Sequence, residues 1–258
     1  MKKSDALILI LFVICAGIAL AFGIPNLITY PDQTAGKLVE DTVPRLSIVI
    51  FLVVLMLTRG YADTFKPEWR VIHLLWSIPC FLVAIVNFPF AALIRGAAVI
   101  ERLDLLWLFI FKCIAIALIE EILFRALLLP FFMERFAKKR YRVLISVLGS
   151  SVLFALMHLF NLFFGAGVGE TMVQVGYTFL IGCMLAVMML KTKNIWLCVI
   201  VHALFNVGGM IVSDLGSGSF QDITFWILTA VAGLLCAVHI VWSLKQIITE
   251  YRSDKFNT

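Results

Sequence analysis

Residues 116–129 read Ile-Ala-Leu-Ile-Glu-Glu-Ile-Leu-Phe-Arg-Ala-Leu-Leu-Leu. Two adjacent carboxylates, Glu120 and Glu121, and the guanidinium of Arg125 interrupt an apolar stretch that otherwise predicts a membrane-spanning helix. A charged side chain at the centre of such a helix costs about 2.5 kcal/mol or more, so intramembrane charges need a partner or a function. The stretch therefore predicts a polar site built inside the bilayer.

The composition of the whole chain is that of an integral membrane protein. Of its 258 residues, 62% are hydrophobic and 14% are charged, and the mean hydropathy is +1.05. Soluble domains average about 45–50% apolar and about 25% charged residues. We therefore expect an all-α, polytopic protein that partners the lipid bilayer and forms a single membrane domain over residues 1–258.

A window of about 20 residues, the length needed to cross the hydrocarbon core, finds eight candidate membrane helices. They cover residues 6–24, 45–58, 71–94, 104–130, 143–164, 171–190, 195–212 and 222–244. The first is expected to be an uncleaved helix; the alternative is a signal peptide, because Lys2 and Lys3 precede it. The third is expected to kink at Pro79 and Pro89. Residues 25–44 are expected to form an external loop.

The distribution of Lys and Arg predicts the orientation of these spans. With the amino terminus in the cytoplasm, the external side receives only Lys37, Arg45, Arg95 and Arg102. The cytoplasmic side receives Lys2, Lys3, Arg59, Lys66, Arg70, Arg135, Lys138, Lys139, Arg140, Arg142, Lys191, Lys193, Lys245, Arg252 and Lys255. Both termini are therefore expected in the cytoplasm. The net charge of +5 is a topology signal and gives no argument for binding nucleic acid.

The six cysteines predict neither a redox motif nor a zinc knuckle, because none of them forms a C-x-x-C pair. They all fall within the apolar spans, at Cys15, Cys80, Cys113, Cys183, Cys198 and Cys236. We interpret them as buried free thiols that behave as small hydrophobic side chains.

Helical spacing separates the two glutamates of the quoted stretch. Glu121 and Arg125 are four residues apart and share a helix face, so they can pair. Glu120 points about 100° away from Glu121. One carboxylate can thus be neutralised while the other faces a different lining, which is the usual arrangement for acid–base chemistry.

Two further spans carry polar residues at a spacing of one helical turn. Phe154 precedes His158 by four residues, and His202 precedes Asn206 by four. Together with Glu120 these side chains could converge on one inward-facing pocket. At 1.5 Å per residue, Glu120 and His202 lie about 15 and 11 Å from the cytoplasmic ends of their spans, so the pocket is expected to open to the cytoplasm.

Such a set of residues has several chemical interpretations. A carboxylate could activate water, with the remaining donors stabilising an oxyanion. Alternatively, Glu120, His158 and His202 could hold a zinc ion. Polar packing between helices and a proton or ion pathway are the remaining alternatives.

Other polar residues in the predicted spans are weaker indicators of a functional site. Lys112 is expected to extend toward the outer surface, and His239 to be a packing residue. Asn161 and Gln174 are weak candidates for lining the pocket.

Three motifs, taken in order, resemble those of the CPBP family. Glu120-Glu121-x-x-x-Arg125, Phe154-x-x-x-His158 and His202-x-x-x-Asn206 match across residues 105–212, which we interpret as the catalytic core. This family, also called Abi, contains intramembrane proteases related to the Rce-type CAAX prenyl endopeptidase and to bacteriocin-processing or immunity proteins. No H-E-x-x-H, G-x-G-D or G-x-S-G stretch favours another class of intramembrane protease.

The resemblance implies a role for each motif residue. Glu120 would activate the attacking water with help from His158, and His202 and Asn206 would bind the oxyanion. Glu121 and Arg125 would support the helix of Glu120. The four-residue spacing by itself allows the Phe154 ring to cover one side of the His158 imidazole. The resemblance leaves both a metal-free, glutamate-type protease and a zinc protease open, and we favour the protease without a cofactor.

The expected function is therefore hydrolysis of a peptide bond in a membrane-associated substrate, either a lipidated protein or a leader peptide. The alternative is a non-catalytic scaffold, or a bacteriocin-immunity or regulatory protein, on the same fold. The compact chain and short loops favour a bacterial inner or plasma membrane as its location.

Overall fold

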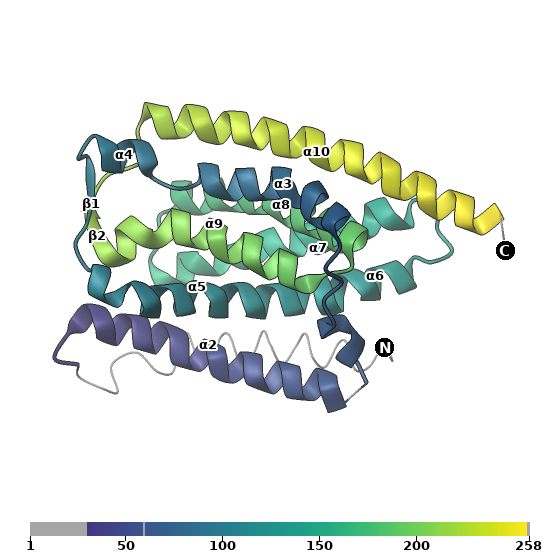
Figure 1. The fold of residues 1–258 in the computed structure, drawn as a ribbon, viewed down its shortest axis with the longest axis horizontal. Coiled ribbons are helices and arrows are strands. Elements are labelled where there is room, and N and C mark those ends of the chain that lie inside the picture. The colour runs from purple at the N-terminus through teal and green to yellow at the C-terminus, as the bar shows by residue number, and fades with distance from the viewer. Residues whose placement is uncertain (1–29, 59, 257–258) are drawn as a thin grey trace.

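The computed structural model describes residues 30–58 and 60–256, in which the secondary structure is almost entirely helical. The long helices lie side by side in a bundle, with α10 along one flank and α2 along the other (Figure 1). The longer elements are α2 (Gln33–Thr58), α3 (Val71–Val86), α5 (Leu106–Glu121), α7 (Arg142–Met157), α8 (Val168–Thr192), α9 (Ile195–Leu215) and α10 (Ile223–Phe256). The expected all-α membrane fold is confirmed.

Short elements connect these helices. The helical ones are η1 (Ala62–Phe65), α4 (Phe90–Ile94), η2 (Leu103–Leu105), the π-helix η3 (Ile122–Leu128), α6 (Leu129–Arg135) and the 3-10 helix η4 (His158–Phe164). Strands β1 (Ala98–Ile100) and β2 (Gly216–Gly218) pair antiparallel, with Val99 opposite Ser217. This small sheet joins the segment before α5 to the end of α9.

Five of the described helices are long and apolar enough to cross a membrane. They are Gln33–Thr58, Arg142–Phe163, Val168–Thr192, Ile195–Leu215 and Ile223–Tyr251. The apolar helix α3 is shorter, and the predicted span 104–130 is a helical run divided among η2, α5, η3 and α6. The predicted span 6–24 lies outside the described residues, so the count of eight spans stays a prediction.

The prediction that residues 25–44 form an external loop is wrong for most of that segment, because α2 begins at Gln33. Asp32 starts this helix as an N-cap, accepting a hydrogen bond from the backbone N–H of Ala35 at 3.0 Å. Arg102 also donates to Asp32, at 2.5 and 3.1 Å. These hydrogen bonds, that of Arg102 above all, lower the pKa of Asp32 to about 2. Pro44 then lies inside the helix without ending it.

The predicted span 71–94 is divided differently from the expectation. α3 continues through Pro79 and ends at Val86, so this proline does not end the helix. The chain turns at Asn87, and Pro89 is the residue before α4. A proline at the start of a helix loses no intrahelical hydrogen bond, which explains why the break falls at the second proline.

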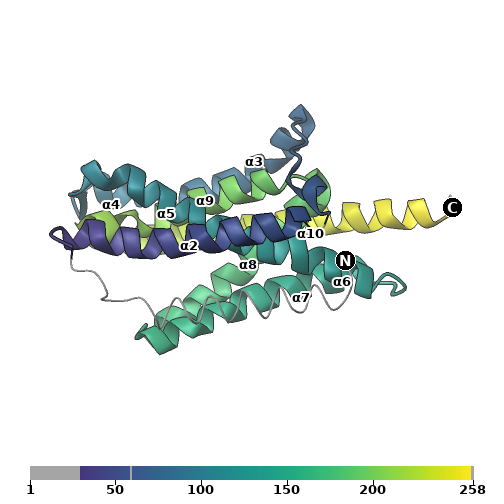
Figure 2. The same cartoon turned by 90° about the horizontal axis from the view of Figure 1, so that it is seen from below.

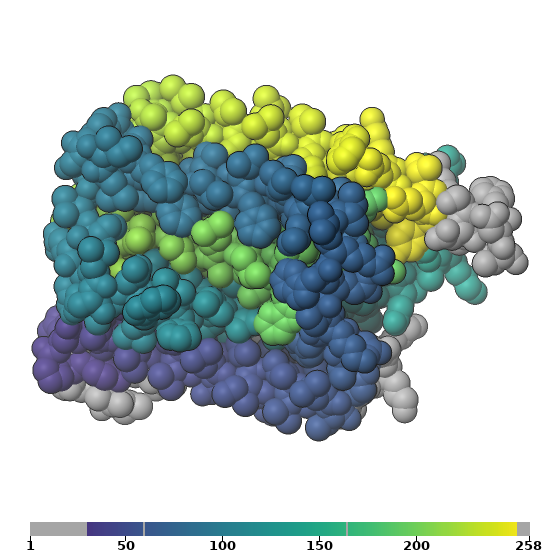
Figure 3. All heavy atoms as spheres, viewed as in Figure 1, coloured from purple at the N-terminus to yellow at the C-terminus, as the bar shows by residue number. Residues whose placement is uncertain are grey.

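Helix α9 occupies the centre of the bundle. It packs against α5 on one side and α3 on the other, and the side chains of α9 are visible only as a strip between these two helices (Figure 3). Seen from the perpendicular direction, α7 and α8 diverge from α5 and α9 toward the end that carries η4 (Figure 2). The motif residues of α5, α7 and α9 nevertheless lie close together, because His202 of α9 contacts both Phe154 of α7 and Glu120 of α5.

The loops predicted to be cytoplasmic lie together at one end of the bundle. Residues 61–66, 136–141 and 193–194 are at the end where the carboxyl terminus lies, on the right of Figure 1. We call this the basic end, because its residues include Lys66, Arg135, Lys138, Lys139, Arg140, Arg142, Lys191 and Lys193. The opposite end carries α4 and the two strands.

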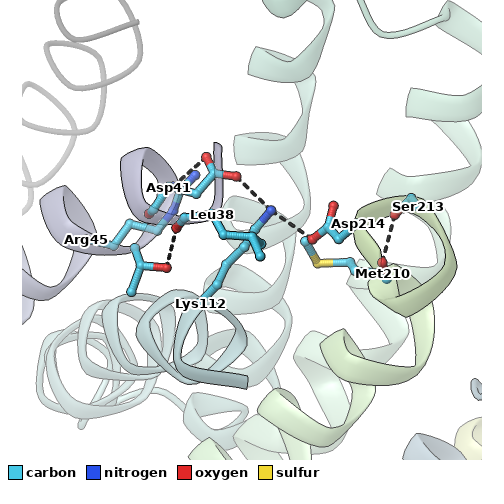
Figure 4. Close-up of polar contacts among 8 residues, drawn as sticks. Leu38, Asp41, Arg45, Lys112, Met210, Ser213 and Asp214 are labelled. Carbon is cyan, nitrogen blue, oxygen red and sulfur yellow. Dashed lines mark hydrogen bonds and ion pairs between the residues drawn. The ribbon is translucent and has the colours of Figure 1, made fainter. Parts of the chain in front are cut away.

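A buried ion-pair cluster joins α2, α5 and α9 near the opposite end. The ammonium of Lys112 lies between two carboxylates, 2.7 Å from Asp41 and 2.9 Å from Asp214 (Figure 4). Arg45 pairs with Asp41 at 3.1 Å, and the side chain of Lys112 is only 6% exposed. The prediction that Lys112 extends to the outer surface is wrong, since α2 and α9 bring acidic partners to it.

This cluster also aligns α5 with the antiparallel helix α9. Lys112 precedes Glu120 by eight residues, and Asp214 follows Asn206 by eight, a rise of about 12 Å in each helix. A pairing of Lys112 with Asp214 therefore brings the level of Glu120 on α5 opposite that of Asn206 on α9.

Replacing Lys112 by Met leaves Asp41 and Asp214 without their shared cation. We expect a loss of about 3–5 kcal/mol in the free energy of unfolding, the range for removing one partner of a buried pair. The control is Lys66→Met, which breaks an ion pair with Asp63 whose side chains are 77% and 86% exposed, and which should change stability little. Unfolding of both variants in detergent measures the difference, and equal small effects would contradict the cluster's role.

Candidate active site

The candidate site begins where α5 changes its helical form. The α-helix ends at Glu121 and continues as the π-helix η3, which contains Arg125. Short π-helical segments inside α-helices occur frequently at functional sites, because the altered hydrogen-bond spacing redirects side chains. Both Glu121 and Arg125 point into the protein, with 0% and 1% of their surface exposed.

Glu121 lies between two basic groups. Its Oε2 is 3.1 Å from Nε of Arg125, which is the pairing that the four-residue spacing predicts. Its Oε1 is 2.6 Å from Nδ1 of His202 on α9. A fully buried carboxylate requires such compensation, because it has exchanged water for the protein interior.

The guanidinium of Arg125 is held by groups from α7 and α8. Its central carbon lies 4.7 Å from the centre of the Phe154 ring, within the range of a cation–π contact. Its Nη2 donates to the carbonyl oxygen of Gly182 at 3.4 Å. A Cβ at position 182 would lie 3.1 Å from both Phe154 and Ser151, so the glycine allows this close approach of α8.

Glu120 occupies a more open environment than its neighbour. Its side chain is 27% exposed, and its Oε2 lies 3.3 Å from Nε2 of His202. The imidazole of His202 therefore has one nitrogen toward each carboxylate, Nδ1 toward Glu121 and Nε2 toward Glu120. The two glutamates thus face different surroundings and share one histidine.

Phe154 separates the two histidines of the site. Its ring meets that of His158 at 5.2 Å and that of His202 at 5.9 Å, both edge to face. His158 is the first residue of η4, and its Nδ1 lies 3.1 Å from the carbonyl oxygen of Phe154. Among the described residues, no hydrogen bond joins His158 to Glu120 or His202.

Asn206 lies one turn beyond His202 on α9. Its amide nitrogen is buried and has no hydrogen-bond partner among the described residues. The neighbouring carbonyl of Phe205 accepts a hydrogen bond at 2.8 Å from Asn87, in the turn that follows α3. A Cβ at Gly208 would lie 2.7 Å from Phe88, so glycine is needed for this contact between the same turn and α9.

The zinc site of Glu120, His158 and His202 stays a prediction. A zinc ion needs these three side chains to converge at about 2.0–2.2 Å from one point. Among the described residues, no three His, Cys, Asp or Glu side chains are grouped in that way.

Some features of the site gave little or no signal in the sequence. The sharing of His202 by both glutamates and the change to a π-helix have no local sequence pattern. Gly182 contributes its backbone carbonyl oxygen, which a search for side-chain motifs cannot identify. Asn87 does stand out as a polar residue in an apolar stretch, and its partner is a carbonyl that only the fold reveals.

Comparison with known proteins identifies the family of this region. Residues 102–208 match the family model described as Type II CAAX prenyl endopeptidase Rce1-like. This part of the chain is Rce1-like. No curated protein and no solved structure shows a significant match.

The Rce1-like segment contains every residue of the candidate site, from Glu120 to Asn206. It confirms the family resemblance carried by the three motifs. The family implies a protease that acts in the membrane on a peptide or protein substrate, and the apolar helices agree with an integral membrane protein. The boundaries of the predicted core, 105–212, stay a prediction.

Replacing Arg125 by Lys keeps the charge and removes the guanidinium group that lies over the Phe154 ring and forms an ion pair with Glu121. We expect a loss of about 2 kcal/mol in the free energy of unfolding, the value of a desolvated cation–π contact. Arg135→Lys, at an exposed position at the end of α6, is the control and should change stability little. Thermal unfolding in detergent measures both, and an unchanged midpoint for Arg125→Lys would show that the charge alone suffices.

Proposed function

We propose that the protein is an intramembrane endopeptidase that hydrolyses a peptide bond with water activated by Glu120. The observation that carries this proposal is the shared histidine: His202 contacts a fully buried glutamate on one side and a partly exposed one on the other. The buried carboxylate is already committed to Arg125 and His202. Glu120 is the carboxylate that remains accessible to water and substrate.

Glu120 is the general base in this proposal. A carboxylate within hydrogen-bond reach of a water molecule can accept its proton as the water attacks a carbonyl carbon. The proton then passes to the amine that leaves when the peptide bond breaks. Glu120 returns to its charged form, so acid and base chemistry use the same side chain.

His158 supports the water from the other side in this proposal. An N–H donated by Nδ1 to the Phe154 carbonyl leaves Nε2 with a free lone pair, which can accept a hydrogen bond from water. The edge of the Phe154 ring fixes the orientation of the imidazole. His158 thus orients the water, and Glu120 takes its proton.

Asn206 and His202 are the proposed oxyanion donors. The buried amide nitrogen of Asn206 lacks a partner, and an unpaired buried donor is expected where a ligand or intermediate supplies the acceptor. His202 lies one turn away on α9 and donates through Nε2 when both ring nitrogens carry protons. Glu121 accepts from Nδ1 in either case and fixes the ring.

The substrate we propose is a membrane-associated peptide or protein, either lipidated or carrying a leader segment. The family description names a CAAX prenyl endopeptidase, and the site lies on membrane helices. His202 is seven residues from the start of α9 at the basic end, a depth of about 11 Å. We propose that the basic end faces the cytoplasm of a bacterium and that the site opens there.

The decisive variant is Glu120→Gln, which keeps the shape of the side chain and removes its basicity. Cleavage should fall by about 10²–10⁴-fold, the usual contribution of a general base, with an unchanged unfolding midpoint. The control is Glu170→Gln, at an exposed position in the first turn of α8. The assay uses purified protein with a farnesylated fluorogenic CAAX peptide and a panel of leader peptides.

A metal chelator provides the second arm of this assay. The proposed metal-free mechanism requires that cleavage survive chelation. Loss on chelation with recovery on added zinc would contradict it. Unchanged cleavage by Glu120→Gln, or no cleavage of any peptide by the wild type, would instead favour a non-catalytic scaffold or immunity protein.

A further inference from the structure

A second polar group lies beside the candidate site, on η4 and α8. The amide of Asn161 donates to Oε1 of Gln174 at 2.7 Å, and the Gln174 side chain also bonds the Tyr177 hydroxyl. None of these three residues belongs to the motifs that carry the proposed chemistry. Asn161 and Gln174 are half-buried, and Tyr177 is exposed.

Helical geometry places this group next to the reacting residues. Side chains three residues apart in a 3-10 helix lie in line, so Asn161 and His158 share one face of η4. Gln174 and Tyr177 are also three residues apart and share a face of α8. The group therefore extends from the wall that carries His158.

Its other side reaches α9. The Tyr177 ring packs at 5.9 Å against that of Phe205, the residue before Asn206. The amide pair and Tyr177 thus lie between η4, which begins at His158, and the part of α9 that carries Asn206.

The Asn161–Gln174 hydrogen bond uses only part of what two primary amides offer. Each amide has two N–H donors and a carbonyl oxygen with two lone pairs. The carbonyl oxygen of Asn161 is left to accept, and an N–H of Gln174 beyond the bond to Tyr177 is left to donate. One acceptor beside one donor matches the alternating N–H and C=O groups of an extended peptide, as in strand-like recognition.

We infer that Asn161 and Gln174 form a subsite that hydrogen-bonds the backbone of an extended peptide beside the scissile bond, with Tyr177 as its wall. This inference rests on the proposed function for the identity of the ligand. Because both amides are uncharged, the subsite recognises the backbone and tolerates different side chains. The remaining alternative is an amide pair that only fastens η4 to α8.

The test measures binding in the Glu120→Gln background, so that it does not depend on cleavage. The probe is the farnesylated CAAX peptide and a series with a single N-methyl group at successive backbone nitrogens, which removes one donor each. At one position, methylation should weaken binding by about three- to tenfold, the worth of one hydrogen bond. Adding Asn161→Leu, which removes the acceptor, should abolish that penalty, because the two changes remove the same contact.

Gln174→Leu in the same background removes the side-chain N–H donor. It should weaken binding of the unmethylated peptide by a similar factor. The control is Thr178→Val, one turn further on α8, whose hydroxyl bonds only backbone carbonyls of its own helix. It should leave affinity and the methylation penalties unchanged.

The outcomes separate this inference from the proposed function. Methylation penalties that are equal with and without Asn161, or the absence of any binding, would overturn the subsite. If the Asn161 and Gln174 variants lower the unfolding midpoint but leave the relative peptide affinities unchanged, the hydrogen bond between the two amides only stabilises the packing of η4 on α8. Cleavage by the wild-type protein decides only the proposed function, since a peptide subsite survives in a non-catalytic relative.

Discussion

A carboxylate with none of its surface exposed, such as that of Glu121, persists inside a membrane protein only where cationic and hydrogen-bonding groups replace water. Arg125 and His202 are those groups, and each is fixed in turn by Phe154 or by the neighbouring Glu120. The buried charge therefore orients the histidine. This requirement connects α5, α7 and α9 at the level of the candidate site.

The polar residues that interrupt the apolar spans find partners in the same way. Lys112 forms ion pairs with two carboxylates, one from α2 and one from α9, and Asn87 donates a hydrogen bond to a backbone carbonyl inside α9. Asn161 pairs with Gln174 across the turn between α7 and α8. Each of these contacts provides a hydrogen-bond or ion-pair partner, which the hydrocarbon of the bilayer cannot provide. Charges thus align the helices, whereas the buried amide nitrogen of Asn206 has no hydrogen-bond partner among the described residues.

Contacts between side chains of the same helical segment could be predicted from the sequence. The Glu121–Arg125 pair and the contact of Phe154 with His158 follow from a four-residue spacing. This spacing keeps the side chains on one face even though Arg125 lies in the π-helix η3 and His158 begins the 3-10 helix η4. The contacts between helices could not be predicted, since they depend on rotation and register. The start of α2 at Gln33 was missed because its first three turns are rich in polar residues and are followed by Pro44, features typical of a loop.

A double-mutant cycle tests most directly the claim that Glu121 acts through His202. Glu121→Gln, His202→Gln and the double variant are compared with wild type in kcat, each checked for folding. Glu121→Gln is expected to lower kcat strongly in the wild type and little once His202 is replaced. Effects that simply multiply would contradict this coupling, and would make the buried glutamate a structural residue independent of the histidine.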